Sequence, residues 1–203
     1  LRREVTSPAQ LARLKHEYEI SSKLHIPDVI TAYALEAYDN NLALVIEDIQ
    51  AVSLSRLLQS RKLGLAEFLM LAARITGIVG EIHRQHIMHL DLNPSNILWN
   101  PDTNQVKCID FGIAAIFSQR SQEARNPNVL EGTLAYMSPE QTGRINRAID
   151  YRSDFYSLGV MLYEMLLGFL PFQTADTMEL VHCHLAKTPK SPHELNQNIP
   201  QPV

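Results

Sequence analysis

Three oxygen-bearing side chains, Asp91, Asn96 and Asp110, mark the stretch of the sequence best suited to chemistry. Two short apolar segments, 97–99 and 106–109, lie between Asn96 and Asp110 and are joined by residues rich in turn formers. These segments favour a β-hairpin. Because a hairpin brings its two ends together, we expect Asn96 and Asp110 to be neighbours. Asp91 lies five residues before Asn96 and can face the same point.

These three residue types together favour the chemistry of phosphoryl transfer. A carboxylate beside a carboxamide suits Mg²⁺, which prefers hard oxygen ligands and keeps part of its coordination shell for water and phosphate oxygens. Asp91 at the same point could orient a hydroxyl nucleophile, and phosphoryl transfer requires little more than a metal ion, positioning and such a base. The alternative interpretation is a turn-rich hairpin with scattered surface acids, since each short motif alone also occurs by chance.

The same residues carry a resemblance to a known family. The stretch from His89 to Asn96 resembles the catalytic loop of protein kinases, and Asp110-Phe111-Gly112 resembles their metal-binding D-F-G motif. The stretch from Gly132 to Glu140 resembles the substrate-docking loop that ends in A-P-E, with Ser138 in place of the alanine. The chain is thus identified as similar to the eukaryotic-type (Hanks-type) serine/threonine protein kinases.

The resemblance implies an α+β, two-lobed protein-kinase-like fold. Residues 1–49 would form a partial small lobe, made of a helix, strands and the hinge, and residues 50–203 would form the mainly helical large lobe. The family's glycine-rich loop and strand lysine have no counterpart in the sequence, which begins at Leu1 rather than at a methionine. We therefore expect the chain to be truncated at both ends and to be inactive by itself.

Roles for the residues of the catalytic site also follow from the resemblance. Asp91 would orient the substrate hydroxyl or accept its proton. Thr133, which follows a glycine as in serine/threonine kinases, would bridge to Asp91 through its hydroxyl. Asn96 and Asp110 would hold Mg²⁺ on the phosphates of ATP.

The nucleotide site implied by the resemblance involves both lobes. Glu17, ten residues before Pro27, would pair with the strand lysine of the family. The alternative for Glu17 is a solvated helix acid, and Glu19 is the second choice for its role. The residues implied for the adenosine part of ATP lie at the hinge and beneath the ring: Ile46, Glu47, Ile49, Ser53 and Leu98.

Two departures from the family pattern bear on catalysis. Leu90 takes the place of the arginine that binds an activation-loop phosphate in the family, so control by loop phosphorylation through this position is in doubt. Asn93, which we include among the catalytic residues, stands where many members carry a lysine for the γ-phosphate. Because positive charge on the transferring phosphoryl group accelerates the reaction, transfer here would be slower or differently assisted.

Composition and charge are those of an ordinary globular protein. The 203 residues are 45% hydrophobic and 20% charged, and the net charge of −4 provides no basic footprint for nucleic acid. Two cysteines without a metal or disulfide pattern favour a reducing, cytoplasmic setting, and Cys108 is expected in a buried strand. No apolar stretch reaches the roughly 18 residues of a membrane span.

The elements that must position these residues are predicted from hydrophobic periodicity and capping signals. We expect helices at 6–24, 53–59, 65–83, 150–168 and 174–186, strands at 29–35 and 42–46 with a strand tail at 1–5, and irregular segments at 118–128 and 188–203. By resemblance, Asp154 would accept hydrogen bonds from the backbone of the catalytic loop, and Glu140 would lack its arginine partner. His83 is interpreted as a surface or capping residue.

Three function hypotheses follow. The main one is an ATP- and Mg²⁺-dependent serine/threonine kinase with a protein substrate. The second is a pseudokinase, a regulatory module of a larger signalling protein that binds nucleotide without transferring phosphate. A small-molecule kinase of related fold is the third, and the docking loop at Gly132 to Glu140 argues against it. The form of the motifs also resembles the kinase heads of large bacterial or fungal sensor proteins, in which ATPase-like, GAF and histidine-kinase modules follow the kinase.

Overall fold

The structure is a computed structural model that describes residues 7–38, 41–117 and 132–201. Its helices are α1 (Pro8–Ser21), α2 (Leu54–Ser60), α3 (Leu65–Arg84), α5 (Arg152–Leu167), α6 (Thr177–Ala186) and α7 (Pro192–Leu195). Its strands are β1 (Ala32–Tyr38), β2 (Asn41–Ile46), β3 (Val52–Ser53), β4 (Ile87–Met88), β5 (Ile97–Asn100), β6 (Gln105–Cys108) and β7 (Ala115–Ile116). Three short 3-10 helices are η1 (Pro94–Asn96), η2 (Leu134–Tyr136) and η3 (Pro139–Thr142).

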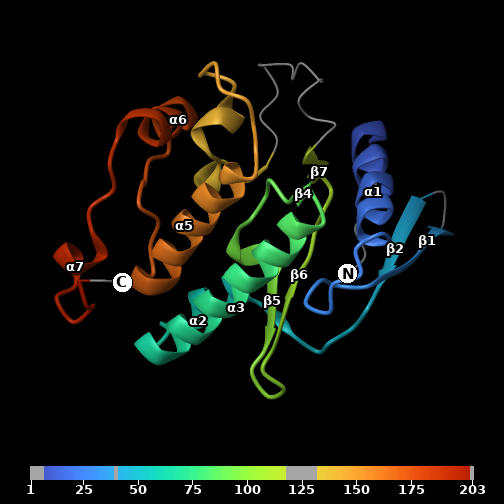
Figure 1. Cartoon of the computed structure of the whole chain (residues 1–203), viewed down its shortest axis with the longest axis horizontal. Helices are drawn as coiled ribbons and strands as arrows, with labels where there is room; N and C mark the ends of the chain where they lie inside the picture. Colours follow the sequence, from blue (N-terminus) through green and yellow to red (C-terminus); the bar gives the residue numbers. More distant parts are fainter. Residues whose placement is uncertain (1–6, 39–40, 118–131, 202–203) are drawn as a thin grey trace.

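The elements divide into a small mixed part and a larger helical part. Figure 1 shows α1 and the antiparallel β1–β2 hairpin on one side, and α2, α3, α5, α6 and α7 on the other, with the β5–β6 hairpin between them. Strands β3, β5 and β6 form one antiparallel sheet, and β4 pairs with β7. This arrangement confirms the predicted α+β, two-lobed fold.

Helix α1 begins where its capping residues predict. Ser7 Oγ accepts a hydrogen bond from the N–H of Gln10 at 3.3 Å, and the Gln10 side chain accepts one from the N–H of Ser7 at 3.1 Å. This reciprocal capping box, with Pro8 at the first helical position, satisfies N–H groups that no preceding turn can serve. The helix ends at Ser21, so the predicted end near Leu24 was three residues too late.

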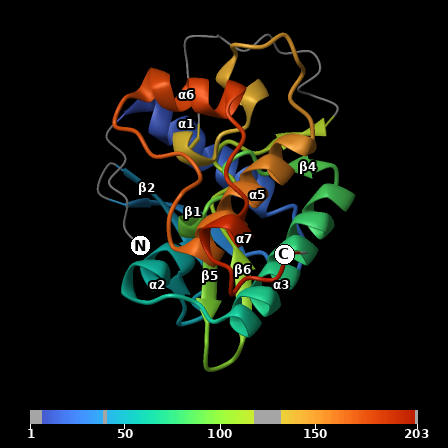
Figure 2. The same ribbon diagram turned by 90° about the vertical axis from the view of Figure 1, so that its left-hand side faces the viewer.

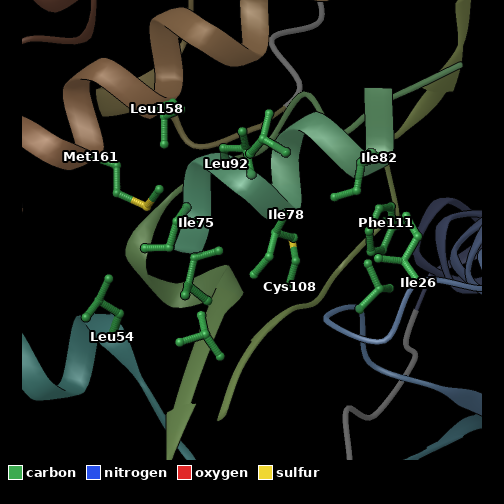
Figure 3. Packing of buried hydrophobic residues seen from close by; sticks show 14 of the residues in the cluster. Ile26, Leu54, Ile75, Ile78, Ile82, Leu92, Cys108, Phe111, Leu158 and Met161 are labelled. Carbon is green, nitrogen blue, oxygen red and sulfur yellow. The ribbon is translucent and has the colours of Figure 1, made fainter. Parts of the chain in front are cut away.

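The main hydrophobic core joins α3 to α5 and to the β5–β6 hairpin (Figure 3). Ile75, Ile78 and Ile82 recur at helical spacing on one face of α3, and each is at most 3% exposed. Met161 of α5 and Cys108 of β6 belong to the same cluster, which confirms the expected burial of that cysteine. In Figure 2, α5 lies in the middle of the helical part, where α3 and α7 contact it. The core thereby supports the two loops that carry the candidate site. We call residues 89–96 the first loop and residues 109–112 the second loop.

The observed elements differ from the prediction mainly at their ends. The first strand begins at Ala32 rather than at residue 29, and Val29 instead forms an isolated parallel bridge with Cys108. The segment 188–203, predicted to be irregular, contains the short helix α7, which Pro192 begins. The predicted strand tail at 1–5 and the irregular segment at 118–128 lie outside the described residues. Within the described part, no helix combines the length and the apolar character needed to cross a membrane.

Candidate active site

The β5–β6 hairpin carries Asn96 and Asp110 to adjacent positions, as its turn formers predict. Its antiparallel register places Ile109 opposite Asn96, and the N–H of Ile109 donates to the Asn96 carbonyl at 2.9 Å. The Asn96 side-chain Nδ2 donates to the backbone carbonyl of Asp91 at 2.8 Å. This bond holds Asp91 close to Asn96 within the first loop. Asp91, Asn96 and Asp110 are 8%, 5% and 8% exposed. Because buried carboxylates require cations or hydrogen-bond donors, this site is suited to a positively charged group.

The donor set of the two loops fits a magnesium ion. Asn96 uses its amide nitrogen on the Asp91 carbonyl, so its Oδ1 is the atom that would act as a metal ligand, and the backbone bond from Ile109 to Asn96 keeps Asp110 on the neighbouring loop. The described residues contain no cluster of three or more histidines, cysteines or acids that could hold a metal by themselves. Mg²⁺ usually takes only one or two protein ligands when it is shared with substrate phosphates, so two ligands suffice here. The metal roles of Asn96 and Asp110 stay predictions.

Asp154 of α5 supports the backbone of the first loop through hydrogen bonds. Leu90 adopts a left-handed backbone with φ of 65°, and Asp110 does so with φ of 64°. Such conformations are costly for a non-glycine residue and persist where the surroundings enforce them. The fully buried Asp154 carboxylate accepts the N–H of His89 at 2.8 Å and that of Leu90 at 2.7 Å, as the resemblance implies. His83 Nε2 lies 2.8 Å from the same carboxylate, so its interpretation as a surface or capping residue was wrong.

The His89 ring is a structural element of the site. Its Nε2 lies 3.0 Å from the carbonyl of Ile109, and its Nδ1 accepts the N–H of Asp91 at 3.3 Å. Burial lowers the pKa of His89, whereas Cys108, Asp154 and the Ile109 carbonyl raise it to about 10. A carbonyl can only accept and a backbone N–H can only donate, however, so the two bonds require a proton on Nε2 and a lone pair on Nδ1, and on this geometry we assign the neutral ring. The ring centroids of His89 and Phe111 are 4.8 Å apart. This contact holds the two loops at a fixed separation.

Thr133 and Asn93 contact Asp91 in a different way from the one predicted. The backbone N–H of Thr133, not its hydroxyl, donates to Asp91 Oδ1 at 2.8 Å. The Thr133 hydroxyl instead accepts Asn93 Nδ2 at 3.1 Å, and the same Nδ2 lies 3.3 Å from Asp91 Oδ1 and 2.9 Å from the Asp91 carbonyl. Asn93 is only 3% exposed. It therefore orients Asp91 inside the loop, and the hydroxyl bridge from Thr133 to Asp91 is corrected to a backbone contact.

The docking loop from Gly132 to Glu140 is fastened to α5 by three hydrogen bonds. Ser157 Oγ donates to the Tyr136 carbonyl at 2.7 Å, the Tyr136 hydroxyl donates to Glu164 at 2.5 Å, and Ser153 Oγ donates to Glu140 at 2.6 Å. Burial and the neighbouring Glu164 carboxylate raise the pKa of Tyr136 above its usual range. Glu140, for which the expected arginine partner has no counterpart in the sequence, is instead held by the Ser153 hydroxyl.

Helix α1 adds a residue that sequence reasoning missed. Nη2 of Arg13 lies 3.5 Å from Asp91 Oδ2 and 3.4 Å from Asp110 Oδ1. Glu17, the predicted partner of the strand lysine, follows one turn later on the same helix and is half-buried. The role of Glu17 stays a prediction. The contacts of Arg13 span 78 and 97 residues of sequence, so no local pattern could have indicated them.

The residues predicted for the adenosine lie around the connection between the lobes. Ile46 ends β2, Glu47 and Ile49 follow it, Ser53 ends β3 and Leu98 lies in β5. Ile46, Ile49 and Leu98 are half-buried, and Ser53 lies opposite Leu98 in the antiparallel sheet. Ser53 also caps α2, because its Oγ accepts the N–H of Arg56 at 3.3 Å. Its hydroxyl thus has a structural task beside the predicted contact with ribose.

A largely buried ion pair, Lys107–Glu47, fixes the segment that connects the two lobes. Lys107 Nζ lies 2.7 Å from Glu47 Oε2, and the two side chains are 7% and 23% exposed. The N–H of Thr31 donates to the same oxygen at 3.2 Å. Burial by itself would raise the pKa of Glu47, but the bonds from Lys107 and Thr31 outweigh it and lower this pKa. Glu47 therefore fixes the connection through its side chain, a role that sequence analysis did not predict.

Lys107→Met is expected to destabilise the full-length protein by about 1–3 kcal/mol at pH 7, because it leaves the Glu47 carboxylate without its cation. The folded pKa of Glu47 is lowered, so the pair stabilises above the ordinary pKa of 4.5, and the benefit is lost as the pH falls below it. Chemical denaturation at pH 7 and pH 4 should show that the difference in free energy of unfolding between Lys107→Met and wild type is smaller at pH 4. Lys187→Met, at an exposed ion pair with Glu179, is the control. Equal losses in both variants would contradict a special role for Lys107.

Comparison with known proteins places the chain in context. The sequence profile of the protein kinase domain matches residues 1–202. The serine/threonine-protein kinase PrkC of Bacillus subtilis is 29% identical over 194 residues, which make up 95% of this chain and 29% of that protein. The serine/threonine-protein kinase pkn3 of Myxococcus xanthus is 31% identical over 190 residues, 90% of this chain and 34% of that protein. Histidine protein kinase 1 of Candida albicans is 35% identical over 135 residues, 64% of this chain and 6% of that protein. The chain thus spans about a third or less of the length of these relatives.

Proposed function

Because the chain belongs to the protein kinase domain family, we propose that the full-length protein is an ATP-dependent serine/threonine protein kinase. Residues 1–49 would contribute to its small lobe and residues 50–203 to its large lobe. One observation carries the proposal. Asp91 and Asn96 on the first loop are joined to Asp110 on the second by the Ile109–Asn96 backbone bond, and the buried Asp154 supports the first loop.

The two acids of the site would have different tasks: Asp91 would accept a proton, and Asp110 would bind the metal ion. Thr133 N–H and Asn93 hold Oδ1 of Asp91, so Oδ2 is the oxygen that takes the proton of a substrate hydroxyl. Asn96 and Asp110 would hold Mg²⁺, which supplies positive charge against the phosphate oxygens when it is bound.

The setting of the site supports a nucleotide-dependent enzyme inside a larger protein. Ile46, Glu47, Ile49, Ser53 and Leu98 are proposed to bind the adenosine, and Glu17 to order the lysine of the small lobe. Further signalling domains in the same protein are proposed, since the relatives of this chain extend far beyond the matched region. A cytoplasmic location is proposed from the two buried, unpaired cysteines, Cys108 and Cys183.

A second candidate function is a pseudokinase, a module that binds nucleotide or a partner without transferring phosphate. Leu90 and Asn93 favour it, because neither supplies the positive charge found at these positions in many kinases. Asn93 is also committed to Asp91 and Thr133 and cannot reach a phosphate without breaking those bonds. The intact set of Asp91, Asn96 and Asp110 favours the active enzyme over this candidate.

Incubation of the full-length protein with labelled ATP, Mg²⁺ and a generic protein substrate is expected to yield acid-stable phosphoserine or phosphothreonine. Removal of the divalent metal with EDTA should abolish incorporation, because Asn96 and Asp110 then hold no ion on the phosphates. Restoring Mg²⁺ in excess should restore it, which controls for damage by the chelator. Metal-independent labelling, or labelling on tyrosine alone, would contradict the proposed function. Nucleotide binding without any transfer would support the pseudokinase instead.

A further inference from the structure

Arg13 lies where the catalytic site needs its cations. Its Nη2 contacts Asp91 Oδ2 at 3.5 Å and Asp110 Oδ1 at 3.4 Å, so a single nitrogen bridges both acids. Asp91 Oδ1 already accepts the N–H of Thr133, which makes Oδ2 the oxygen available to a substrate hydroxyl. Arg13 therefore takes the oxygen needed by the nucleophile and one oxygen of a proposed magnesium ligand at the same time.

The approach of Arg13 to the second loop depends on Gly112. A Cβ atom at Gly112 would lie 2.5 Å from Nε and 2.7 Å from Cγ of Arg13, so the arginine side chain runs directly over the glycine backbone. One turn of α1 later, His16 Nε2 lies 2.8 Å from the carbonyl of Ala114. Two side chains on the same face of α1 therefore join this helix to the loop that follows Asp110.

The distances show that this bridge can be displaced. Charge-assisted hydrogen bonds between a guanidinium and a carboxylate are normally about 2.7–2.9 Å long, so both contacts of Arg13 are weak. Its side chain is 39% exposed, whereas those of the two acids are 8% and 9% exposed. The guanidinium can thus move into solvent without unfolding α1, while the acids stay in place.

We propose that Arg13 is a built-in counter-cation of the catalytic site, which pairs with Asp91 and Asp110 until Mg²⁺ and nucleotide displace it. This regulatory role rests on the proposed function of the same site. Its single positive charge offsets part of the negative charge of two nearly buried carboxylates in the metal-free protein and so reduces the repulsion between them. It also keeps Asp91 from accepting a hydroxyl before the metal and the nucleotide are bound.

Binding measurements on the full-length protein test the proposal directly. Calorimetric titrations would use Mn²⁺ alone and the magnesium complex of a non-hydrolysable ATP analogue. Arg13→Gln should bind both about three- to tenfold more tightly than wild type, because the competing charge is gone. Arg13→Lys, which keeps the charge, should stay nearer to wild type. Lys15→Gln removes an exposed charge from the same helix and should change neither affinity.

Ionic strength gives a second readout. Because the guanidinium is partly exposed, the difference between wild type and Arg13→Gln should shrink when salt is raised from about 0.05 M to 0.5 M. Equal affinities in wild type and Arg13→Gln at low salt would overturn the proposal. Weaker binding of the nucleotide complex by Arg13→Gln, with Mn²⁺ affinity unchanged, would also overturn it and assign Arg13 to the phosphates. If wild type transfers no phosphate but Arg13→Gln still binds Mn²⁺ more tightly, the counter-cation stands and the kinase proposal fails.

Discussion

Asp91→Asn is expected to lower the rate of phosphate transfer by about three orders of magnitude at saturating Mg²⁺-ATP. The amide cannot accept the proton of the substrate hydroxyl, and a positioned base of this kind typically contributes about 10²–10⁴ in rate. The replacement is nearly isosteric, and its oxygen can still accept the N–H of Thr133 at the position of Oδ1. The folded structure should therefore change little, so the loss should appear in kcat.

The measurement is single-turnover transfer from labelled ATP, together with calorimetric binding of the nucleotide analogue. Nucleotide affinity should stay equal to wild type or rise, because the substitution removes one of the two carboxylates that Arg13 contacts. Asp102→Asn is the matched control, since Asp102 is an exposed acid in the turn of the adjacent hairpin. Equal incorporation by wild type and Asp91→Asn would remove the catalytic role of Asp91.

The parts of the site that lie close in sequence could be predicted. Turn formers between two apolar segments were enough to bring Asn96 beside Asp110, because an antiparallel hairpin leaves few alternatives for its ends. The capping box that starts α1 at Ser7 was equally local. In both cases the partners lie within about fifteen residues, where periodicity and turn chemistry decide the geometry.

Contacts between distant elements could not be predicted. Arg13 reaches Asp110 across 97 residues, and Lys107 reaches Glu47 across 60, although each looks like an ordinary charged residue in its own segment. His83 has no spacing that marks it, yet burial of Asp154 beneath it turns it into a third hydrogen-bond partner. Such roles arise when packing removes water from a charge, and the sequence alone does not show which charges are buried.

Thr133 shows why a motif predicts proximity better than chemistry. The resemblance correctly brought Thr133 to Asp91, but the bond to Asp91 is made by the backbone N–H, while the hydroxyl accepts Asn93 Nδ2. Thr133, Asn93 and Asp91 thus form one hydrogen-bonded arrangement, although the sequence presented Thr133 and the departure at Asn93 as separate features.

Asp154→Ala is expected to be the most destabilising single substitution considered, with a cost of about 3–5 kcal/mol in the free energy of opening the large lobe. It leaves the N–H groups of His89 and Leu90 buried without an acceptor, and it removes the partner of His83. Each orphaned donor costs about 1–3 kcal/mol, and the left-handed backbone of Leu90 loses the bond that holds it. Phosphate transfer should also slow, because Asp91 is the next residue after Leu90 and would lose its fixed position.

Hydrogen–deuterium exchange of the full-length protein can measure this opening locally, because the exchange rate of a protected amide reports the free energy of the opening that exposes it. Peptides that contain His89 and Leu90 should lose most of their protection in Asp154→Ala. Asp150→Ala is the matched control, because Asp150 precedes the same helix but pairs with the exposed Arg152 at 2.7 Å, a surface pair worth no more than about 1 kcal/mol. Unchanged protection of the His89 peptide in Asp154→Ala would mean that the loop keeps its shape without the carboxylate. The strain at Leu90 would then have to be held by the surrounding core alone.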